Sequence, residues 1–502
     1  MSFRIAFIGA GSLGFTRKLL ADLMAVPAFQ ETPPEIVFHD IDADNLERVR
    51  RLCQRDLDAN EARIQILATL DRREAISGAK YVLSTVRIGG LETYRDDIEI
   101  PLEYGVDQCV GDTLGPGGLM YAQRGIPAML DFCRDIREVA RPDCLFLNYS
   151  NPMAMLTWAA IEAGGVDTIG LCHGVQGGHR QIAEVLGLPK EEVDIICAGI
   201  NHQTWYIQVK HQGVDRTGDL LEAFEKHENL SQTQKVRIDV LRRFGYFSTE
   251  SNGHLSEYLA WYRKRPEEIQ EWISLDHWIH GETGGYLRSC TERENWFTQE
   301  FEAILSEPAW NFAERERSEE HGSYIIEGLE TDKIYRGHFN RQNQGVIANL
   351  PEDCIIEAPG YVDANGIAMP TVGDLPLGCA AICQQSINVQ RMGMRAALSG
   401  DATLLKQAMT LDPLTAAVCN PAEVWEMTDR MLVAQAQWLP QYAQSGAIDA
   451  AKATLATGPK LARFPGNRGA ARQRVKSVEE RAAEEAQKAA SKETLPAHMQ
   501  SG

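Results

Sequence analysis

The sequence lacks a long apolar run, a secretory leader and a paired cysteine pattern. No segment approaches the about 18 consecutive apolar residues of a membrane span, and Met1 leads directly into a short strand-like run at residues 3–8. The eleven cysteines are odd in number and scattered, which does not suggest a disulfide framework of a secreted protein. We therefore expect a soluble, cytoplasmic protein that does not bind a membrane.

Positive charge is also scarce. The 502 residues include 50 Lys and Arg against 70 Asp and Glu, which gives a formal net charge of −20. A surface that follows the phosphates of nucleic acid is therefore not expected. Hydrophobic residues make up 44% of the chain, enough for one large or two moderate cores, and we expect two lobes.

The N-terminus does contain a dinucleotide-binding pattern. Residues 4–8 form a run typical of a buried parallel strand, and Gly9, Gly11 and Gly14 follow with the spacing G-x-G-x-x-G. Gly9 would permit the tight turn, Gly11 would let a pyrophosphate approach the backbone, and Gly14 would let a helix pack on the strand. The predicted cofactor-binding residues of this loop are Gly9, Gly11, Ser12, Leu13 and Gly14.

The next strands extend this pattern. Residues 35–40 end in Asp40, a candidate partner for a ribose hydroxyl that favours NAD over NADP, although Asp42 competes for the role. Alternatively, Asp40 caps the helix that begins at Ala43. Further strands alternate with helices, which predicts a parallel, doubly wound, Rossmann-like sheet of the kind found in lactate and malate dehydrogenases.

Ligands bind at the carboxyl ends of strands in such sheets, and polar residues follow two of the predicted strands. We expect Arg87 and Asn151 to contact substrate and Asn148 to contact the cofactor. Asp112 lies in a glycine-rich loop at residues 111–118, which would let the backbone approach a ligand. Asp112 could act as an acid, a base or a hydroxyl clamp, or it could bond the amides of its own loop.

Two more predicted strands end in residues that can bind a metal. Cys172 and His173 follow the first of them, and Asn201 and His202 follow the second. Sulfur and imidazole could thus reach a common point. Taken singly, a cysteine or histidine of this kind is more often a buried core residue.

In this order, the motifs resemble glycoside hydrolase family 4, in particular its branch that acts on non-phosphorylated α-glycosides. The resemblance covers roughly residues 3–440. Besides the segments above, it includes the sequences Gly245-Tyr246-Phe247, His254 to Tyr258 and Val362-Asp363-Ala364-Asn365-Gly366.

The resemblance implies a reaction that differs from ordinary two-carboxylate glycoside hydrolysis. Bound NAD+ takes hydride from C3 of the sugar, a base removes the C2 proton, and the C1 substituent is eliminated. Water then adds, the hydride returns, and the configuration is retained. A divalent ion, usually manganese, binds the sugar hydroxyls.

Individual roles follow from the resemblance. Cys172 and His202 would bind the metal, although sulfur with imidazole would ordinarily favour zinc or iron over manganese. His173 would be the leaving-group acid or a hydroxyl contact, or it would orient Cys172. Tyr258 and His254 are both candidates for the C2 base, with Glu257 close by. Alternatively, the segment around Tyr258 is a helix whose apolar stripe buries that side chain.

Gly174 suggests the substrate. Glycine after Cys-His resembles the uronidase pattern, so an α-glucuronidase or α-galacturonidase is the leading prediction. Asn201 would contact the sugar, and Arg87, Arg124 or Arg180 could bind its carboxylate. Val175-Gln176-Gly177 resembles the alternative, an α-galactosidase of melibiase type. A simple NAD-dependent dehydrogenase is the alternative from a different class.

The expected organisation has three parts. Residues 1–198 form the cofactor-binding domain, and residues 199–447 form a mixed α+β lobe that closes over the cleft and makes contacts in a homo-oligomer, a dimer or tetramer. Residues 448–502 form a polar, helical C-terminal extension, with helix expected over residues 472–492. This extension would be a peripheral helix at an oligomer contact or a partly disordered tail.

Overall fold

The computed structural model describes residues 3–494. Within them, one sheet of thirteen strands has the order β10-β8-β7-β12-β11-β6-β5-β4-β1-β2-β3, with β13 beside β12 and β9 beside β8. The strands are β1 (Arg4–Ile8), β2 (Glu35–His39), β3 (Leu67–Thr69), β4 (Ala79–Ser84), β5 (Leu145–Asn148), β6 (Thr168–Gly170), β7 (Val193–Ile200), β8 (Gln203–His211), β9 (Val214–Asp215), β10 (Phe247–Ser248), β11 (Tyr335–Gln342), β12 (Ile355–Asp363) and β13 (Gly366–Ala368).

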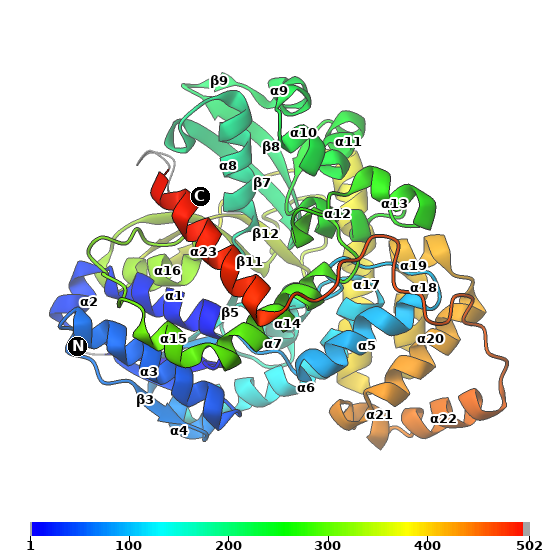
Figure 1. The fold of residues 1–502 in the computed structure, drawn as a ribbon, viewed down its shortest axis with the longest axis horizontal. Helices are drawn as coiled ribbons and strands as arrows, with labels where there is room; N and C mark the ends of the chain where they lie inside the picture. Colours follow the sequence, from blue (N-terminus) through cyan, green and yellow to red (C-terminus); the bar gives the residue numbers. More distant parts are fainter. Residues whose placement is uncertain (1–2, 495–502) are drawn as a thin grey trace.

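Helices surround this sheet (Figure 1). In the first half of the chain they are α1 (Leu13–Met24), α2 (Pro27–Glu31), α3 (Ala43–Ala59), α4 (Arg72–Ile76), α5 (Gly90–Leu102), α6 (Gly115–Val139), α7 (Met153–Glu162), α8 (Gly174–Leu186), α9 (Leu220–Lys226), α10 (Leu230–Thr233) and α11 (Lys235–Phe244). They continue with α12 (Asn252–Tyr258), α13 (Pro266–Trp272), the 3-10 helix η3 (Trp278–His280), α14 (Gly285–Gln299), α15 (Phe301–Ser306), α16 (His321–Thr331), α17 (Leu377–Ser399), α18 (Ala402–Leu411), α19 (Pro413–Val418), α20 (Pro421–Ala434), α21 (Pro440–Gln444), α22 (Ala447–Thr457) and α23 (Val478–Thr494).

The strands β3, β2, β1, β4, β5 and β6 are parallel throughout. Their order is that of dinucleotide-binding domains. Alternate residues of each strand face opposite sides. In β1, Ala6 and Ile8 join the core covered by α6, α7 and α17, whereas Ile5 and Phe7 join the core covered by α1, α3 and α16. Burial on both faces explains the continuous apolar runs, and the predicted Rossmann-like fold is confirmed.

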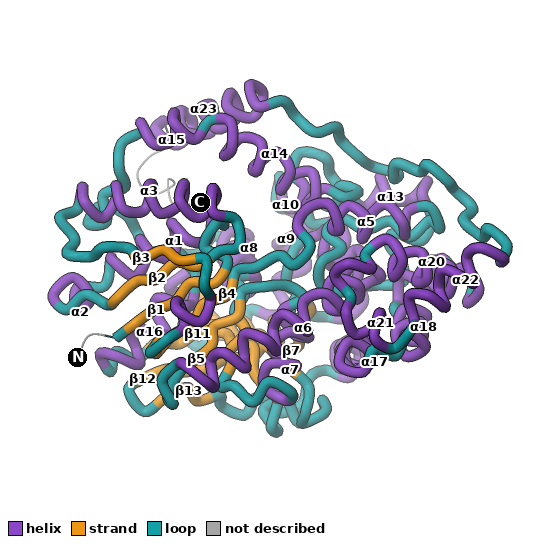
Figure 2. The backbone as a smooth tube through the Cα atoms, turned by 90° about the horizontal axis from the view of Figure 1, so that it is seen from below, coloured by secondary structure: helices purple, strands orange, loops and turns teal. Residues whose placement is uncertain are grey.

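The remaining strands continue the same sheet in antiparallel pairs. β11 joins the parallel half through a bridge between Asn340 and Gly170, and β12, β7, β8 and β10 follow. The second lobe is therefore mixed, as predicted, but its strands extend the first sheet rather than forming a second one. The boundary expected after residue 198 falls inside β7. Figure 2 shows the strands gathered in one layer among the helices.

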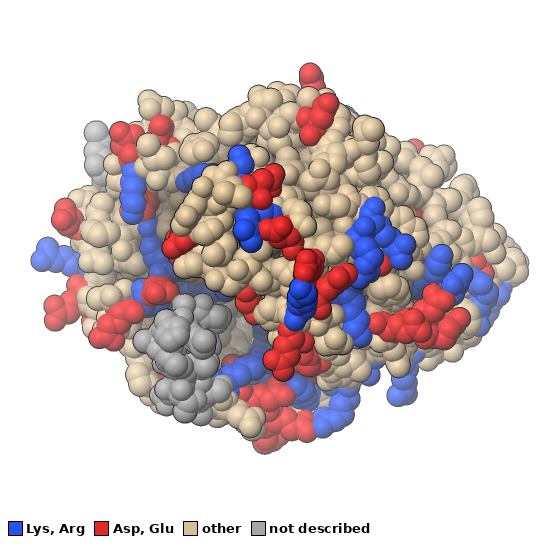
Figure 3. Space-filling view, turned by 90° about the horizontal axis from the view of Figure 1, so that it is seen from above, with Lys and Arg blue, Asp and Glu red and all other residues tan. Residues whose placement is uncertain are grey.

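Residues 448–494 of the C-terminal extension pack along the body of the protein. After α22, residues 458–477 return past α5 and α14 without regular secondary structure, and we call this segment the strap. The chain then forms α23, which packs against α14 (Figure 1). The strap includes Ala471, which is buried and whose carbonyl accepts the backbone N–H of Thr283 at 2.8 Å. Within residues 3–494, the helices are all too short or too polar to span a membrane. Basic and acidic side chains lie interleaved on the face shown in Figure 3.

Candidate functional site

The glycine loop between β1 and α1 makes the predicted tight turn at Gly9. Gly9 has a φ of +85°, and a Cβ atom there would lie 2.9 Å from Cγ1 of Val86, so only glycine fits this turn. The backbone N–H of Gly11 donates to Oδ2 of Asp40 at 2.8 Å. At Gly14 an added Cβ atom would have nothing within 4 Å of it, so close packing on the strand does not explain this glycine.

Asp40 and Asp42 have different positions at the end of β2. Asp42 caps α3, because its Oδ1 accepts the backbone N–H groups of Asp44 and Asn45, both at 3.0 Å. Asp40 lies beside the glycine loop instead and accepts from the N–H of Gly11 and of Asp42. The residue that caps α3 is therefore Asp42 and not Asp40.

Asp112, Arg87 and Asn151 meet at the carboxyl ends of β4 and β5. The buried Asp112 carboxylate accepts Nδ2 of Asn151 at 3.1 Å and the hydroxyl of Thr113 at 3.0 Å. Nη2 of Arg87 lies 3.9 Å from the same carboxylate, and its guanidinium carbon is 4.4 Å from the ring centroid of Tyr94. Nη1 of Arg87 is buried with no hydrogen-bond partner among the described residues. This donor is available to a ligand.

Asn148 and Glu257 hold the backbone of two loops near this site. The amide of Asn148 bonds the N–H and carbonyl of Ser150 in its own turn. The buried Glu257 carboxylate accepts three backbone N–H groups, from Cys109 at 2.6 Å, Val110 at 3.0 Å and Gly111 at 3.1 Å. Glu257 therefore holds the loop that carries Asp112. No sequence signal pointed to this contact.

Three potential metal-binding side chains converge beyond β6, β7 and β10. Among the described residues, ligand atoms of Cys172, His202 and Glu250 all lie within 4.8 Å of one another. The first two were predicted as a pair, whereas Glu250 was missed. Its only trace in the sequence is the glycine at position 174, because a Cβ atom there would lie 2.4 Å from Cγ of Glu250. The glycine thus makes room for this glutamate rather than for the substrate.

The electrostatics of this cluster suit a cation. Burial lowers the pKa of His202 to about 4, so its imidazole is neutral and able to bind a metal near neutral pH. Burial raises the pKa of Glu250, but His254, His202 and His173 outweigh it and bring the pKa to about 2. Burial also raises the pKa of the Cys172 thiol well above its usual range. A bound divalent ion would favour its thiolate.

The two candidate bases contact this cluster differently. Nδ1 of His254 lies 2.8 Å from the hydroxyl of Ser251 and 3.0 Å from Oε2 of Glu250. Tyr258 is buried, as the apolar-stripe alternative predicted, yet its hydroxyl lies 3.4 Å from Nδ1 of His202. Burial raises the pKa of Tyr258 well above its usual value. His254 is therefore oriented by a carboxylate, whereas Tyr258 is linked to a candidate metal ligand.

His173 and Asn201 each contact a different buried glutamate. Nδ1 of His173, whose side chain is 52% exposed, lies 3.3 Å from Oε1 of Glu320. Burial opposes the charged imidazole, but Glu320 outweighs this effect and raises the pKa of His173. Nδ2 of Asn201 donates at 3.5 Å to the buried Glu357, whose pKa is raised to about 8 by burial. Glu320 and Glu357 were both missed because neither lies in a recognisable motif.

Two of the three arginines considered for carboxylate recognition have structural partners. Arg124 is buried against Asp97 with an N–O distance of 2.6 Å. Arg180 pairs with Glu319 at 2.7 Å on the surface. Their charges are therefore neutralised within the protein, and neither is left to bind a sugar carboxylate.

Comparison with known proteins identifies relatives for nearly the whole chain. Residues 4–188 match the Family 4 glycosyl hydrolase and residues 197–415 match the Family 4 glycosyl hydrolase C-terminal domain. An α-galactosidase of Rhizobium meliloti (strain 1021) is 57% identical over 489 residues, which are 97% of this chain and 99% of that protein. An α-galactosidase of Bacillus subtilis (strain 168) is 34% identical over 88% of this chain and 99% of its own length.

A solved structure has the same fold. The 6-phospho-β-glucosidase of Thermotoga maritima, crystallised with manganese, NAD+ and glucose-6-phosphate, superposes with a TM-score of 0.71. The alignment covers 87% of this chain and 99% of that one, with 23% sequence identity.

The predicted preference for uronides is wrong. The α-galacturonidase of Bacillus subtilis (strain 168) is only 27% identical over 82% of this chain, far below the Rhizobium meliloti α-galactosidase. The structure explains why Gly174 misled: Glu250 fills the space that was assigned to a sugar carboxylate. A buried carboxylate there would repel an acidic sugar.

The two family matches together span most of the chain, and both relatives align over almost their full lengths. The parallel sheet with its glycine loop agrees with them. The chain therefore belongs to glycoside hydrolase family 4, the NAD-dependent glycosidases.

Proposed function

We propose that this protein is an α-galactosidase that requires NAD+ and a divalent ion, with manganese as the metal. The observation that carries the proposal is the 57% identity to the Rhizobium meliloti α-galactosidase over 97% of this chain. The metal and cofactor named for the Thermotoga maritima structure support the same assignment.

The residues present fit a divalent ion. Cys172 and His202 supply sulfur and nitrogen, which alone favour zinc or iron. Glu250 adds a carboxylate oxygen within the same 4.8 Å cluster, and hard oxygen ligands suit manganese. The N-terminus of α1, which directly follows the glycine loop and has no side-chain cap, likewise fits a dinucleotide diphosphate. When bound, NAD+ would accept hydride at C3 of the sugar and the metal would stabilise negative charge on its hydroxyl oxygens.

Glu250 would connect the metal-binding cluster with the residue that removes the C2 proton. Its Oε1 lies 4.0 Å from Sγ of Cys172, and its Oε2 lies 3.0 Å from Nδ1 of His254. The second contact fixes the ring and leaves Nε2 to take the C2 proton of the sugar, so His254 is the proposed base. Tyr258 would position His202 through its hydroxyl contact.

Other residues would bind and protonate the sugar. The Asp112 carboxylate and Nη1 of Arg87, which has no hydrogen-bond partner among the described residues, would bond hydroxyl groups of the sugar. His173, charged through its contact with Glu320, would donate a proton to the departing oxygen at C1.

The activity can be tested with four nitrophenyl glycosides in the presence of NAD+, Mn2+ and a reductant. We expect hydrolysis of the α-galactoside and at least about tenfold less of the α-glucoside, α-glucuronide and α-galacturonide. Chelation should stop turnover and added Mn2+ should restore it. Inertness of all four substrates would refute the hydrolase, and net NADH formation from a simple alcohol would indicate a dehydrogenase instead.

Gly174→Ala should weaken metal binding. A methyl group 2.4 Å from Cγ of Glu250 forces that side chain to move, so we expect Mn2+ affinity to fall about tenfold or more and stability to fall by about 1–3 kcal/mol. Calorimetric titration with Mn2+ and thermal unfolding measure these effects. Gly177→Ala, on the same helix with nothing within 4 Å of its Cβ position, is the matched control and should bind Mn2+ normally.

A further inference from the structure

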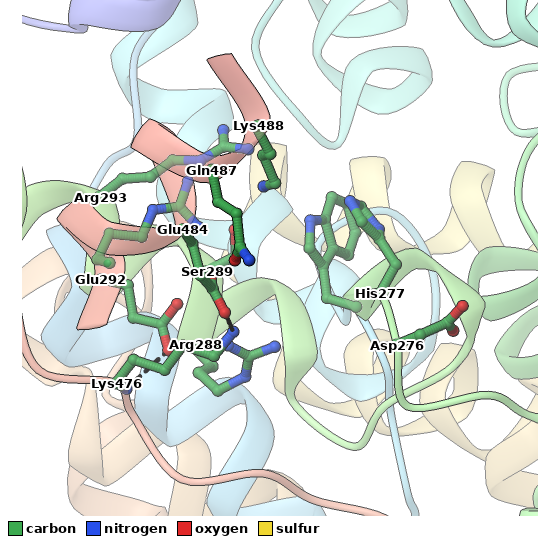
Figure 4. A pocket seen from close by; sticks show the side chains of 12 residues that line it. Asp276, His277, Arg288, Ser289, Glu292, Arg293, Lys476, Glu484, Gln487 and Lys488 are labelled. Atoms are coloured by element: carbon green, nitrogen blue, oxygen red, sulfur yellow. Dashed lines mark hydrogen bonds and ion pairs between the residues drawn. The ribbon is translucent and has the colours of Figure 1, made fainter. Parts of the chain in front are cut away.

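A cavity of about 340 Å³ lies between the C-terminal helix α23 and the segment formed by η3 and α14. Its volume is within the range of about 300–1,000 Å³ that is usual for small-molecule sites. His277 lies on one side, and Gln487 and Lys488 of α23 lie on the other (Figure 4). Trp278 and Arg481 also line the cavity. The extension thus supplies one wall of a small-molecule-sized space.

The cavity adjoins the catalytic residues through Trp278. The indole ring centroid lies 6.4 Å from that of His254, and it stacks on Tyr286 at 4.7 Å. Tyr286 in turn lies 5.4 Å from the guanidinium carbon of Arg87. One side chain therefore borders both the cavity and the proposed base.

The lining favours a neutral, hydroxyl-rich ligand. Four of the five basic side chains that line the cavity are in ion pairs. Arg288 contacts Glu292 at 2.8 Å and Lys476 contacts Glu484 at 2.5 Å, whereas Arg481 and Lys488 contact Glu485 at 2.7 Å and 3.7 Å. Little net positive charge remains to attract a phosphate. Nε of Arg481 is a buried donor without a partner among the described residues. The half-buried Trp278 offers an apolar face, and such mixed surfaces suit a sugar ring.

The strap holds α23 in place over this cavity. The backbone N–H of Gln473 donates to Glu282 at 3.1 Å, and that of Lys476 donates to Glu292 at 2.8 Å. The family C-terminal domain match ends at residue 415, before the strap begins. The Rhizobium meliloti relative aligns over 97% of this chain, so most of the extension has a counterpart there. The extension is therefore an addition to the family domains and is shared with that relative.

We propose that the cavity between η3, α14 and α23 is a subsite for the leaving-group side of the glycoside, and that it accepts a second, neutral sugar unit. The inference rests on the proposed α-galactosidase function. In this proposal α23 selects among galactosides, whereas the residues that precede the C-terminal extension carry out the hydrolysis.

The test compares methyl α-galactoside with a trisaccharide that ends in α-galactose, using the full chain with NAD+ and Mn2+. Arg481→Met keeps the aliphatic length of the side chain but removes its donors. We expect kcat/KM for the trisaccharide to fall about tenfold, through KM, while the value for the methyl glycoside is unchanged. Gln487→Ala should also lower kcat/KM for the trisaccharide relative to that for the methyl glycoside. Glu479→Gln, an exposed change on α23 outside the cavity, is the control.

The outcomes separate the two proposals. If the unaltered enzyme cleaves neither galactoside, the α-galactosidase function is wrong. If it cleaves both galactosides, the subsite is refuted when the two α23 variants leave kcat/KM unchanged for both substrates or lower it by the same factor for both. The α-galactosidase function would still stand in that case. An increase of the NAD+ dissociation constant in Arg481→Met, without a change in the ratio, would instead assign the cavity to the cofactor.

Discussion

Cys172→Ser is expected to abolish turnover while leaving NAD+ binding nearly intact. The thiol lies within the 4.8 Å cluster that also contains His202 and Glu250, and serine is a much weaker ligand than thiolate. We expect Mn2+ affinity to fall by more than about a hundredfold. Loss of a residue that only hydrogen-bonds to a metal ligand usually lowers metal affinity by about 10–100-fold, and loss of a ligand itself should cost more. The glycine loop follows a different strand, β1, so the NAD+ site is untouched.

Calorimetric titration with Mn2+ and fluorescence titration with NAD+ would measure the two affinities separately. Cys419→Ser is a suitable control, because this partly exposed cysteine bonds the backbone carbonyl of Tyr104 and lies outside the metal-binding cluster. Normal Mn2+ affinity in Cys172→Ser would exclude the ligand role. Parallel loss of NAD+ binding would point to a folding defect instead.

Features formed by residues that are neighbours in the sequence could be predicted from the sequence. The apolar run of β1 and the glycines after it lie within a dozen residues, because the turn that they form is itself local. Cys172 and His202 were predicted as a pair from the family resemblance, and their ligand atoms do lie together although Cys172 follows the parallel strand β6 and His202 follows β7 in the antiparallel half of the sheet. A helix cap was also predicted before Ala43, but it was assigned to Asp40, whereas the residue that caps α3 is Asp42.

Contacts between distant segments could not be predicted in this way. Glu250 is 78 positions from Cys172, and nothing in its flanking sequence shows that β10 joins the sheet beside β8. The role of Gly174 was misread for this reason, because its missing side chain is explained only by the glutamate that packs there. The antiparallel half of the sheet depends on the same kind of long-range pairing, which sequence periodicity does not specify.

His254→Gln should nearly eliminate the chemical step. A proton transfer by a positioned side chain contributes about 10²–10⁴-fold to rate, so we expect kcat to fall by that factor. Glutamine can still bond Glu250, so Mn2+ affinity should change by no more than about tenfold. When hydrolysis runs in D2O, the unaltered enzyme should place deuterium at C2 of the released sugar, because the base exchanges its proton with solvent.

Tyr258→Phe distinguishes the two candidate bases. Its hydroxyl contacts Nδ1 of His202 at 3.4 Å, and loss of this contact should weaken Mn2+ binding by about 10–100-fold. At saturating Mn2+, the phenylalanine variant should still incorporate deuterium at C2, whereas His254→Gln should not. The reverse pattern would transfer the role of base to Tyr258 and leave His254 as a support for Glu250. Because burial raises the pKa of Tyr258 and the carboxylate orients His254, we expect the first pattern.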